Sequence, residues 1–131
     1  MKHFKIIVLA FLIVAFCGAC KQKSDVYKTP EKVTEVFIKA FATADFENMY
    51  KYSVPANAVI IRNLQKTMRN YPDKLAEIQK NEVEIVKVTS KSVNDTLAIC
   101  KCDYKMQDGD HNSEFRVKKM DGKWLVDMSE N

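Results

Sequence analysis

Histidine is scarce in this sequence of 131 residues, which contains only two, and beyond the first twenty residues His111 stands alone. A structural zinc site needs four ligands, and the pair Cys100 and Cys102 would lack the two partners that complete it. In an extended strand these cysteines lie close to 7 Å apart, at the limit of disulfide geometry. We therefore expect no metal, no cofactor and no disulfide here, and we interpret both cysteines as small buried hydrophobic residues.

Long basic runs are missing as well. The chain has 21 lysines and arginines against 17 acidic residues, and the longest basic run beyond residue 20 is the pair Lys118 and Lys119. Nucleic-acid binders concentrate positive charge on one face, helix or segment. The scattered charge excludes this class, so we expect no nucleic-acid partner.

The longest hydrophobic run, from Ile6 to Phe16, is too short to remain as a transmembrane helix, which needs about 20 apolar residues. Lys2 and Lys5 precede it, and the small residues of Cys17-Gly18-Ala19 follow it. A positive start, a short apolar run and a small-residue cleavage site are the three parts of an export signal. The sequence thus predicts a signal peptide at residues 1–19 and an exported mature chain.

Gly18-Ala19-Cys20 resembles the lipobox of bacterial lipoproteins. This resemblance implies that the Cys20 thiol is lipidated and that acyl chains anchor the protein to a membrane. The sequence from Lys21 to Lys28 is short, polar and without periodicity, which predicts a tether over residues 20–28. Cys17 departs from the aliphatic residue usual at its position, and ordinary signal peptidase could cut the same bond to release a soluble protein with a free Cys20. Lys21 is not the acidic residue that commonly retains lipoproteins at the inner membrane, so the resemblance favours the outer membrane, facing the periplasm.

Residues 29–131 are long enough for one small domain, which we expect to begin with helices. Thr29-Pro30-Glu31 is a typical helix start, and apolar residues then recur with helical spacing at Val33, Val36, Phe37, Ala40, Phe41 and Ala44. Asp45 is positioned to cap a short second helix that ends before Val54-Pro55. We expect a third helix over residues 56–69, with Ile60, Leu64 and Met68 in line, and a further turn or two over residues 74–80.

From residue 82 onward the apolar period changes to two, which predicts strands over residues 82–89, 96–106, 111–120 and 123–128. Turns are expected around Asn94-Asp95, and at Asp108-Gly109 and Asp121-Gly122, which are strong hairpin dipeptides. Two-residue loops at the last two sites define a register. It places Val117 opposite Val126, Phe115 opposite Met128, Cys102 opposite Phe115, Cys100 opposite Val117, and Arg116 opposite Asp127.

The predicted register puts these apolar residues on one face, together with Trp124. It also places like charges side by side, Asp103 beside Glu114 and Lys101 beside Arg116, so a bulge or a slip of the strands stays open as an alternative. Helices followed by an antiparallel meander that is apolar on one face predict the α+β class, with N-terminal helices covering one side of a curved four-stranded antiparallel sheet.

This order of elements resembles the cystatin-like, nuclear transport factor two-like superfamily. The resemblance lies in the helix at residues 30–41, the break at Ala44-Asp45-Phe46 and the final hairpin around Asp121-Gly122-Lys123-Trp124. The sequence is similar in particular to uncharacterised small exported lipoproteins with this domain. The resemblance implies a cone whose open end forms a pocket, and it carries no catalytic signature.

Polar residues that point into such a cone are the candidate site. The predicted register places Tyr104, His111 and Ser113 on the inner face, and Phe41, Tyr50 and Trp124 could form apolar walls. We expect a non-catalytic domain that binds a small ligand or an envelope protein, or that forms a homodimer. The alternative is a small enzyme with His111 as general base, Tyr104 orienting the substrate and Ser113 as a hydrogen-bond partner.

One observation separates the two kinds of binding. Leu97, Ile99 and Leu125 fall on the outer face of the predicted sheet. A contiguous exposed apolar patch there would favour a protein interface. Isolation of these side chains among charged neighbours would favour the pocket instead.

Overall fold

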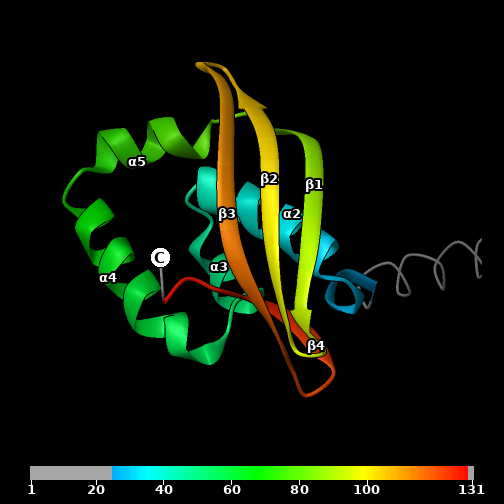
Figure 1. The fold of residues 1–131 in the computed structure, drawn as a ribbon. Helices are drawn as coiled ribbons and strands as arrows, with labels where there is room; N and C mark the ends of the chain where they lie inside the picture. Colours follow the sequence, from blue (N-terminus) through cyan, green and yellow to red (C-terminus); the bar gives the residue numbers. More distant parts are fainter. Residues whose placement is uncertain (1–24, 130–131) are drawn as a thin grey trace, which may run out of the picture.

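The computed structural model describes residues 25–129, which fold into helices followed by a four-stranded antiparallel sheet (Figure 1). The α+β class is therefore confirmed, and the sheet is not closed. The signal peptide, Cys20 and most of the expected tether lie outside the described residues. In chain order the elements are η1 (Val26–Lys28), α2 (Pro30–Ala42), α3 (Phe46–Lys51), η2 (Pro55–Asn57), α4 (Ala58–Arg69), α5 (Pro72–Gln79), β1 (Glu84–Asn94), β2 (Leu97–Met106), β3 (Gly109–Met120) and β4 (Lys123–Asp127).

Helix α2 begins where the sequence predicts. The Thr29 hydroxyl accepts a hydrogen bond from the Lys32 N–H at 3.3 Å, and Pro30 occupies the first helical position. The helix lies along one face of the sheet (Figure 1). Its buried face is wider than predicted because Thr34 and Ile38 are also fully buried, whereas Phe41 remains 38% exposed.

Helix α3 follows a sharp break at Ala44, whose φ is +52°. As predicted, Asp45 caps it, because the Asp45 carboxylate accepts the Asn48 N–H at 3.3 Å and the Asn48 side-chain amide at 2.7 Å. Short polar side chains of this kind therefore determine where the chain reverses between α2 and α3.

Helices α4 and α5 form an arm that extends to one side of the sheet (Figure 1). Ile60 was expected to lead the buried stripe of α4, and this is wrong: Ile61 is fully buried, while Ile60 is 38% exposed. The stripe runs through Ile61, Leu64 and Met68 at i, i+3 and i+7, and α4 begins at Ala58, after η2, instead of at residue 56. None of the helices within residues 25–129 has the length and apolar character needed to cross a membrane.

Strand β1 is longer than predicted, since it continues to Asn94 instead of ending at residue 89. Its last five residues are exposed and all but Val93 are polar, so their sequence shows little apolar alternation. They are strand because their backbone pairs with β2, from Ser90 opposite Cys100 to Asn94 opposite Leu97. The turn around Asn94-Asp95 is where the sequence predicts it, and the Asn94 side chain accepts the Thr96 N–H at 2.9 Å.

The register of the β3–β4 hairpin is as predicted, with Val117 opposite Val126 and Arg116 opposite Asp127. Asp121 and Gly122 both have positive φ, +52° and +78°, as a type I′ turn requires. The paired ladder ends at Asp127, so the predicted pairing of Phe115 with Met128 does not form within it.

The register of the β2–β3 hairpin differs from the prediction by two residues. Cys100 lies opposite Phe115, Cys102 opposite Ser113, and Ala98 opposite Val117. The loop consists of Gln107 and Asp108, and Gly109, at φ +127°, already begins β3. The shift removes the like-charge neighbours of the predicted register, because Lys101 now faces Glu114 at 3.7 Å.

The edge of β4 is covered by the segment between α3 and η2. The Val54 N–H donates to the Val126 carbonyl at 2.9 Å, and the Val126 N–H donates to the Tyr52 carbonyl at 3.0 Å. Asn57, fully buried, donates its side-chain amide to the Val126 carbonyl at 3.1 Å and accepts the Met128 N–H at 3.3 Å. The base of the arm is thereby fastened to the last strand.

Candidate functional site

Three of the predicted pocket residues come together near the β2–β3 hairpin. Tyr104 and His111 are cross-strand partners whose rings stack with centroids 5.4 Å apart. The Tyr104 hydroxyl lies 3.3 Å from the Ser113 hydroxyl, within hydrogen-bonding distance. Tyr104 itself is only 6% exposed, so its ring belongs to the core, and the cluster presents mainly the His111 side chain to solvent.

The nearest partner of His111 is the turn residue Asp108, whose Oδ1 lies 2.6 Å from His111 Nε2. The hydrogen bond from His111 lowers the pKa of Asp108. A carboxylate in this position orients an imidazole, which is one requirement for a general base. The pair nevertheless lies at the hairpin turn, where the Asp108 side chain is 69% exposed. The adjoining cavity of about 340 Å³ is lined by residues of β2 and β3 and by Val86, and Ser113 is not part of its lining.

The remaining predicted wall residues lie elsewhere. Trp124 pairs with Lys119, at the opposite end of β3 from His111. Tyr50 is on α3, and Phe41 packs against Phe37 and Phe115 with both ring centroids at 6.3 Å. The structure therefore does not gather Tyr104, Trp124 and Tyr50 around one cavity.

Cys100 and Cys102 are free and fully buried, which confirms the sequence-based interpretation of both as core residues. Burial raises the pKa of the Cys102 thiol to about 11, with the neighbouring Asp103 carboxylate adding to the shift. Within residues 25–129 no three histidine, cysteine or acidic side chains are grouped so that they could hold a metal ion.

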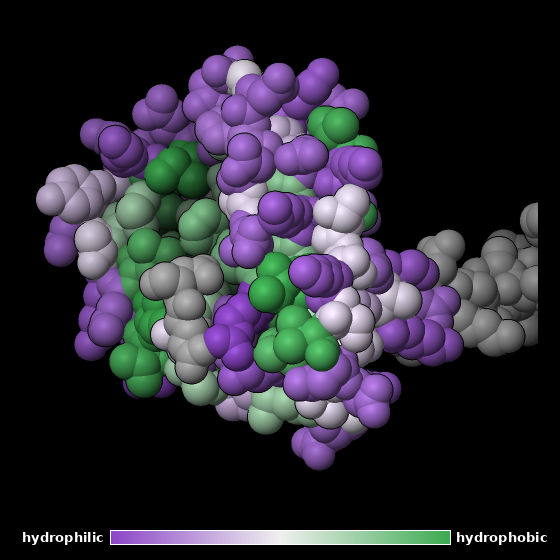
Figure 2. All heavy atoms as spheres, in the orientation of Figure 1, coloured by the Kyte–Doolittle hydropathy of each residue, from purple (hydrophilic) through white to green (hydrophobic). Residues whose placement is uncertain are grey.

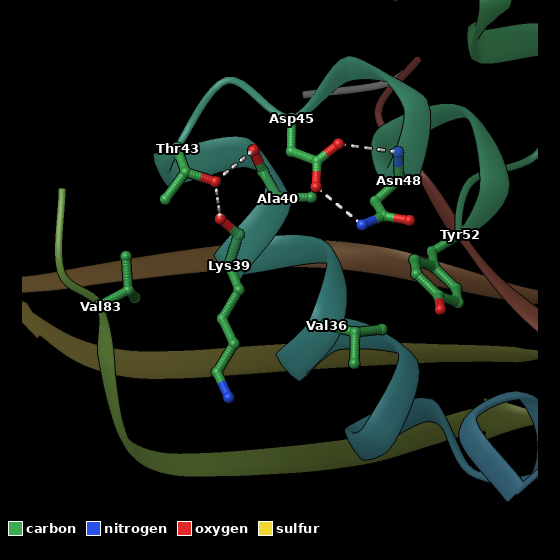
Figure 3. Close-up of a pocket in the computed structure, with 8 residues that line it drawn as sticks. All are labelled: Val36, Lys39, Ala40, Thr43, Asp45, Asn48, Tyr52 and Val83. Carbon is green, nitrogen blue, oxygen red and sulfur yellow. Dashed lines mark hydrogen bonds between the residues drawn. The ribbon is translucent and has the colours of Figure 1, made fainter. Parts of the chain in front are cut away.

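A cavity of about 360 Å³ lies between α2, α3 and Val83 (Figure 3). Its polar side chains are engaged in shaping the chain. Asp45 caps α3 through Asn48, and the Thr43 hydroxyl donates to the Lys39 carbonyl at 2.7 Å (Figure 3). These interactions explain Thr43, Asp45 and Asn48 as groups that shape the end of α2 and the start of α3.

The cavity that best fits a ligand is at the other end of the sheet, where the β1–β2 turn and the β3–β4 hairpin approach η2. It has a volume of about 450 Å³, and its apolar walls come from Val54, Pro55, Ala56, Leu97 and Met120. Small-molecule sites typically combine such walls with a few well-placed polar groups. Here those groups include Lys118, Lys119 and Asp127.

Lys118 and Asp127 form the strongest polar feature of this cavity, with Lys118 Nζ 2.8 Å from Asp127 Oδ2. The Asp127 side chain is 1% exposed, and its Oδ1 accepts the Ser129 N–H at 2.9 Å and the Ser129 hydroxyl at 2.5 Å. Burial alone would raise the pKa of Asp127, but the hydrogen bonds from Lys118 and Ser129 outweigh burial and lower the pKa to about 2.

This lowered pKa makes stability depend on pH. Because the carboxyl has a lower pKa folded than unfolded, its contribution is complete above about pH 5 and is lost as the pH falls towards 2. We expect Asp127→Asn to lower the free energy of unfolding by about 2 kcal/mol at pH 7 and by much less near pH 2. Urea unfolding at several pH values measures this difference, with Asp73→Asn in α5 as an exposed control. A loss that is the same at every pH would contradict the expectation.

On the outer face of the sheet, Leu97 and Ile99 are adjacent along β2, and charged residues lie opposite them on β3. Leu97 and Leu125 are separated by Lys118, which faces both, and Ile99 faces Arg116. All three apolar side chains are half-buried. Leu97 and Ile99 are therefore not isolated from each other, and the criterion set from the sequence does not separate a pocket from a protein interface on that face.

Sequence reasoning missed this cavity because its lining comes from four separate segments. The sequence pattern indicates only a helix stop at Val54-Pro55, and the predicted register gives Asp127 only Arg116 as a partner. The signal that could have found it is Asp127, an acidic residue between Val126 and Met128 at the end of an apolar strand.

A scan against protein-family models gave no match for this chain, and neither did a search of curated proteins.

Proposed function

We propose that the chain is an exported envelope protein, anchored through lipid on Cys20, whose single α+β domain binds a small amphipathic ligand and catalyses no reaction. The anchor is supported by the sequence of residues 1–20. Ligand binding is supported by one observation above the others, the apolar cavity with the Lys118–Asp127 ion pair in its lining.

The chemistry of the cavity suggests the class of ligand. Its apolar walls favour a flat or branched hydrophobic body, and the ammonium group of Lys119, which is paired with no carboxylate among residues 25–129, favours an anionic end. The Asp127 carboxylate is paired with Lys118 and accepts a hydrogen bond from Ser129. We therefore expect it to hold Lys118 in place and not to bind a cationic group of the ligand.

Binding can be tested with anilinonaphthalene sulfonate, an aromatic anion that matches this description and fluoresces in apolar surroundings. We expect saturable binding to the native protein. Ala56→Trp, which fills the cavity from the exposed residue Ala56, is expected to weaken binding at least tenfold. Ala76→Trp, at an exposed position on α5, is the matched control. Equal binding by both variants, with both folded, would contradict the proposed site.

The anchor is tested by the intact mass of the mature protein purified from membranes, with fragmentation of its N-terminal peptide. We expect a chain that begins at Cys20 and carries the mass of two or three acyl chains. An unmodified chain that begins at Cys20 would contradict the anchor and indicate a soluble exported protein.

A further inference from the structure

The described chain begins at Asp25 on one side of the sheet, and the α4–α5 arm lies on the opposite side (Figure 1). Only four residues, 21–24, separate Asp25 from Cys20. Even a fully extended chain covers at most about 3.6 Å per residue, so this link reaches roughly 18 Å. If Cys20 carries lipid, the surface around Asp25 must therefore lie close to the bilayer.

That surface is built from aromatic rings and lysines. The Tyr27 and Tyr52 rings lie against each other with centroids 5.6 Å apart. Lys123 Nζ lies 4.9 Å from the centre of the Tyr27 ring, and Lys51 Nζ lies 5.4 Å from that of Tyr52. These contacts connect η1, the end of α3 and the start of β4.

The adjoining hairpin extends the same chemistry. Lys119 Nζ lies 5.9 Å from the centre of the Trp124 ring. Within residues 25–129, neither Lys51, Lys119 nor Lys123 forms an ion pair with a carboxylate, whereas Lys28 is paired with Asp25 at 2.9 Å. Lysines without carboxylate partners are therefore placed over tyrosine and tryptophan rings on the end of α3 and the β3–β4 hairpin, and Lys123 of that hairpin reaches Tyr27 of η1, two residues after Asp25.

We propose that this aromatic and basic surface, Tyr27, Lys51, Tyr52, Lys119, Lys123 and Trp124, docks on the anionic headgroups of the membrane that holds the anchor. Tyrosine and tryptophan are favoured at the interface between lipid and water, and lysines near a bilayer are attracted by anionic lipids. The inference rests on the proposed lipid anchor and adds an orientation: the hairpin side faces the bilayer and the arm points away from it.

In this orientation the apolar α4–α5 arm is accessible from the aqueous side. Figure 2 shows hydrophobic side chains gathered along the arm and around the hollow between the arm and the sheet. Val59, Ile60 and Tyr71 of this region are 62%, 38% and 58% exposed. The cavity that contains Lys119 and Met120 lies beside the docking surface, next to the headgroups.

Trp124 is the only tryptophan in the chain, so its fluorescence reports on this surface alone. Protein purified from membranes is mixed in detergent with phosphatidylcholine, with or without 30% phosphatidylglycerol, and with lipids brominated near the headgroup, and the detergent is then removed to form vesicles. We expect Trp124 to be quenched at least twofold more strongly in the anionic vesicles. High salt should remove the difference, because it screens exposed charges.

The double variant Lys51→Glu, Lys123→Glu is expected to lose this extra quenching. Lys74→Glu, Lys80→Glu makes the same change of charge on the arm and should keep it. Flotation with the vesicles separates the two hypotheses. Protein that floats with both vesicle types but shows equal quenching would overturn the docking surface alone. Protein that floats with neither would overturn the anchor and the orientation derived from it.

Discussion

Replacing Phe37 by alanine is expected to cost about 3 to 5 kcal/mol of unfolding free energy, which is a large share of the total for a domain of this size. Phe37 is completely buried in the middle of α2. Its ring meets Phe115 of β3 edge to face, with centroids 5.4 Å apart, and lies alongside Phe41. Truncation removes the side chain that joins the helix to the sheet and leaves a cavity that the rigid strands cannot close.

Phe41→Ala is the matched control for this prediction, because it removes the same side chain from the same helix at a position that is 38% exposed. We expect a loss of about 1 to 2 kcal/mol, since part of the ring is already in water. Chemical unfolding followed by circular dichroism measures both losses. Comparable losses at the two positions would show that α2 does not bury its face against β3 as the structure has it.

The second large effect is expected at Asn57. Leucine has the same branched skeleton of non-hydrogen side-chain atoms as asparagine, but it is larger and cannot form hydrogen bonds. Asn57→Leu would therefore leave the Met128 N–H without its partner and remove one of the two donors to the Val126 carbonyl. Losing buried hydrogen bonds in this way costs about 1 to 3 kcal/mol for each group left unpaired, so we expect a loss of roughly 3 kcal/mol.

Asn57→Leu has a second expected result, because Asn57 joins the base of the arm to β4. Amide hydrogen exchange should become faster in α4 and β4 than in β1 and β2, whose mutual pairing does not involve Asn57. Asn63→Leu, on the exposed side of α4, is the control and should change stability by less than about 0.5 kcal/mol. Uniformly faster exchange in every element would show that Asn57 supports the whole fold equally and is not a local fastening.

Local sequence signals determined the helices and turns that do not depend on distant contacts. Thr29-Pro30-Glu31 starts α2, Asp45 caps α3, and Asp121-Gly122 forms the last turn, because in each case the side chain or the permitted φ acts on its own neighbours. The apolar alternation of β2 also identified Cys100, Cys102 and Tyr104 on its buried face, to which the structure adds Ala98. Such signals need no knowledge of where the rest of the chain lies.

Tertiary contacts decided what these local signals left open. The observed β2–β3 register differs from the predicted one by two residues. Because a shift of two keeps every side chain on its predicted face, the apolar pattern cannot separate the two registers. The observed register is favoured by the Lys101–Glu114 pair across the strands and by the positive φ of Gly109 at the start of β3. In the same way, β1 continues past its apolar residues only because β2 lies beside it.

For the candidate sites too, the sequence predicted some features and the tertiary structure decided the others. The sequence by itself determined that Tyr104, His111 and Ser113 share one face, because alternation along paired strands fixes sides. Only the tertiary structure decided that Trp124 lies far from them, and that Asp127 is buried against Lys118 in a cavity walled by Val54 and Leu97. The physical reason is that a cavity is formed by segments distant in the sequence, and their meeting depends on packing that no local pattern encodes.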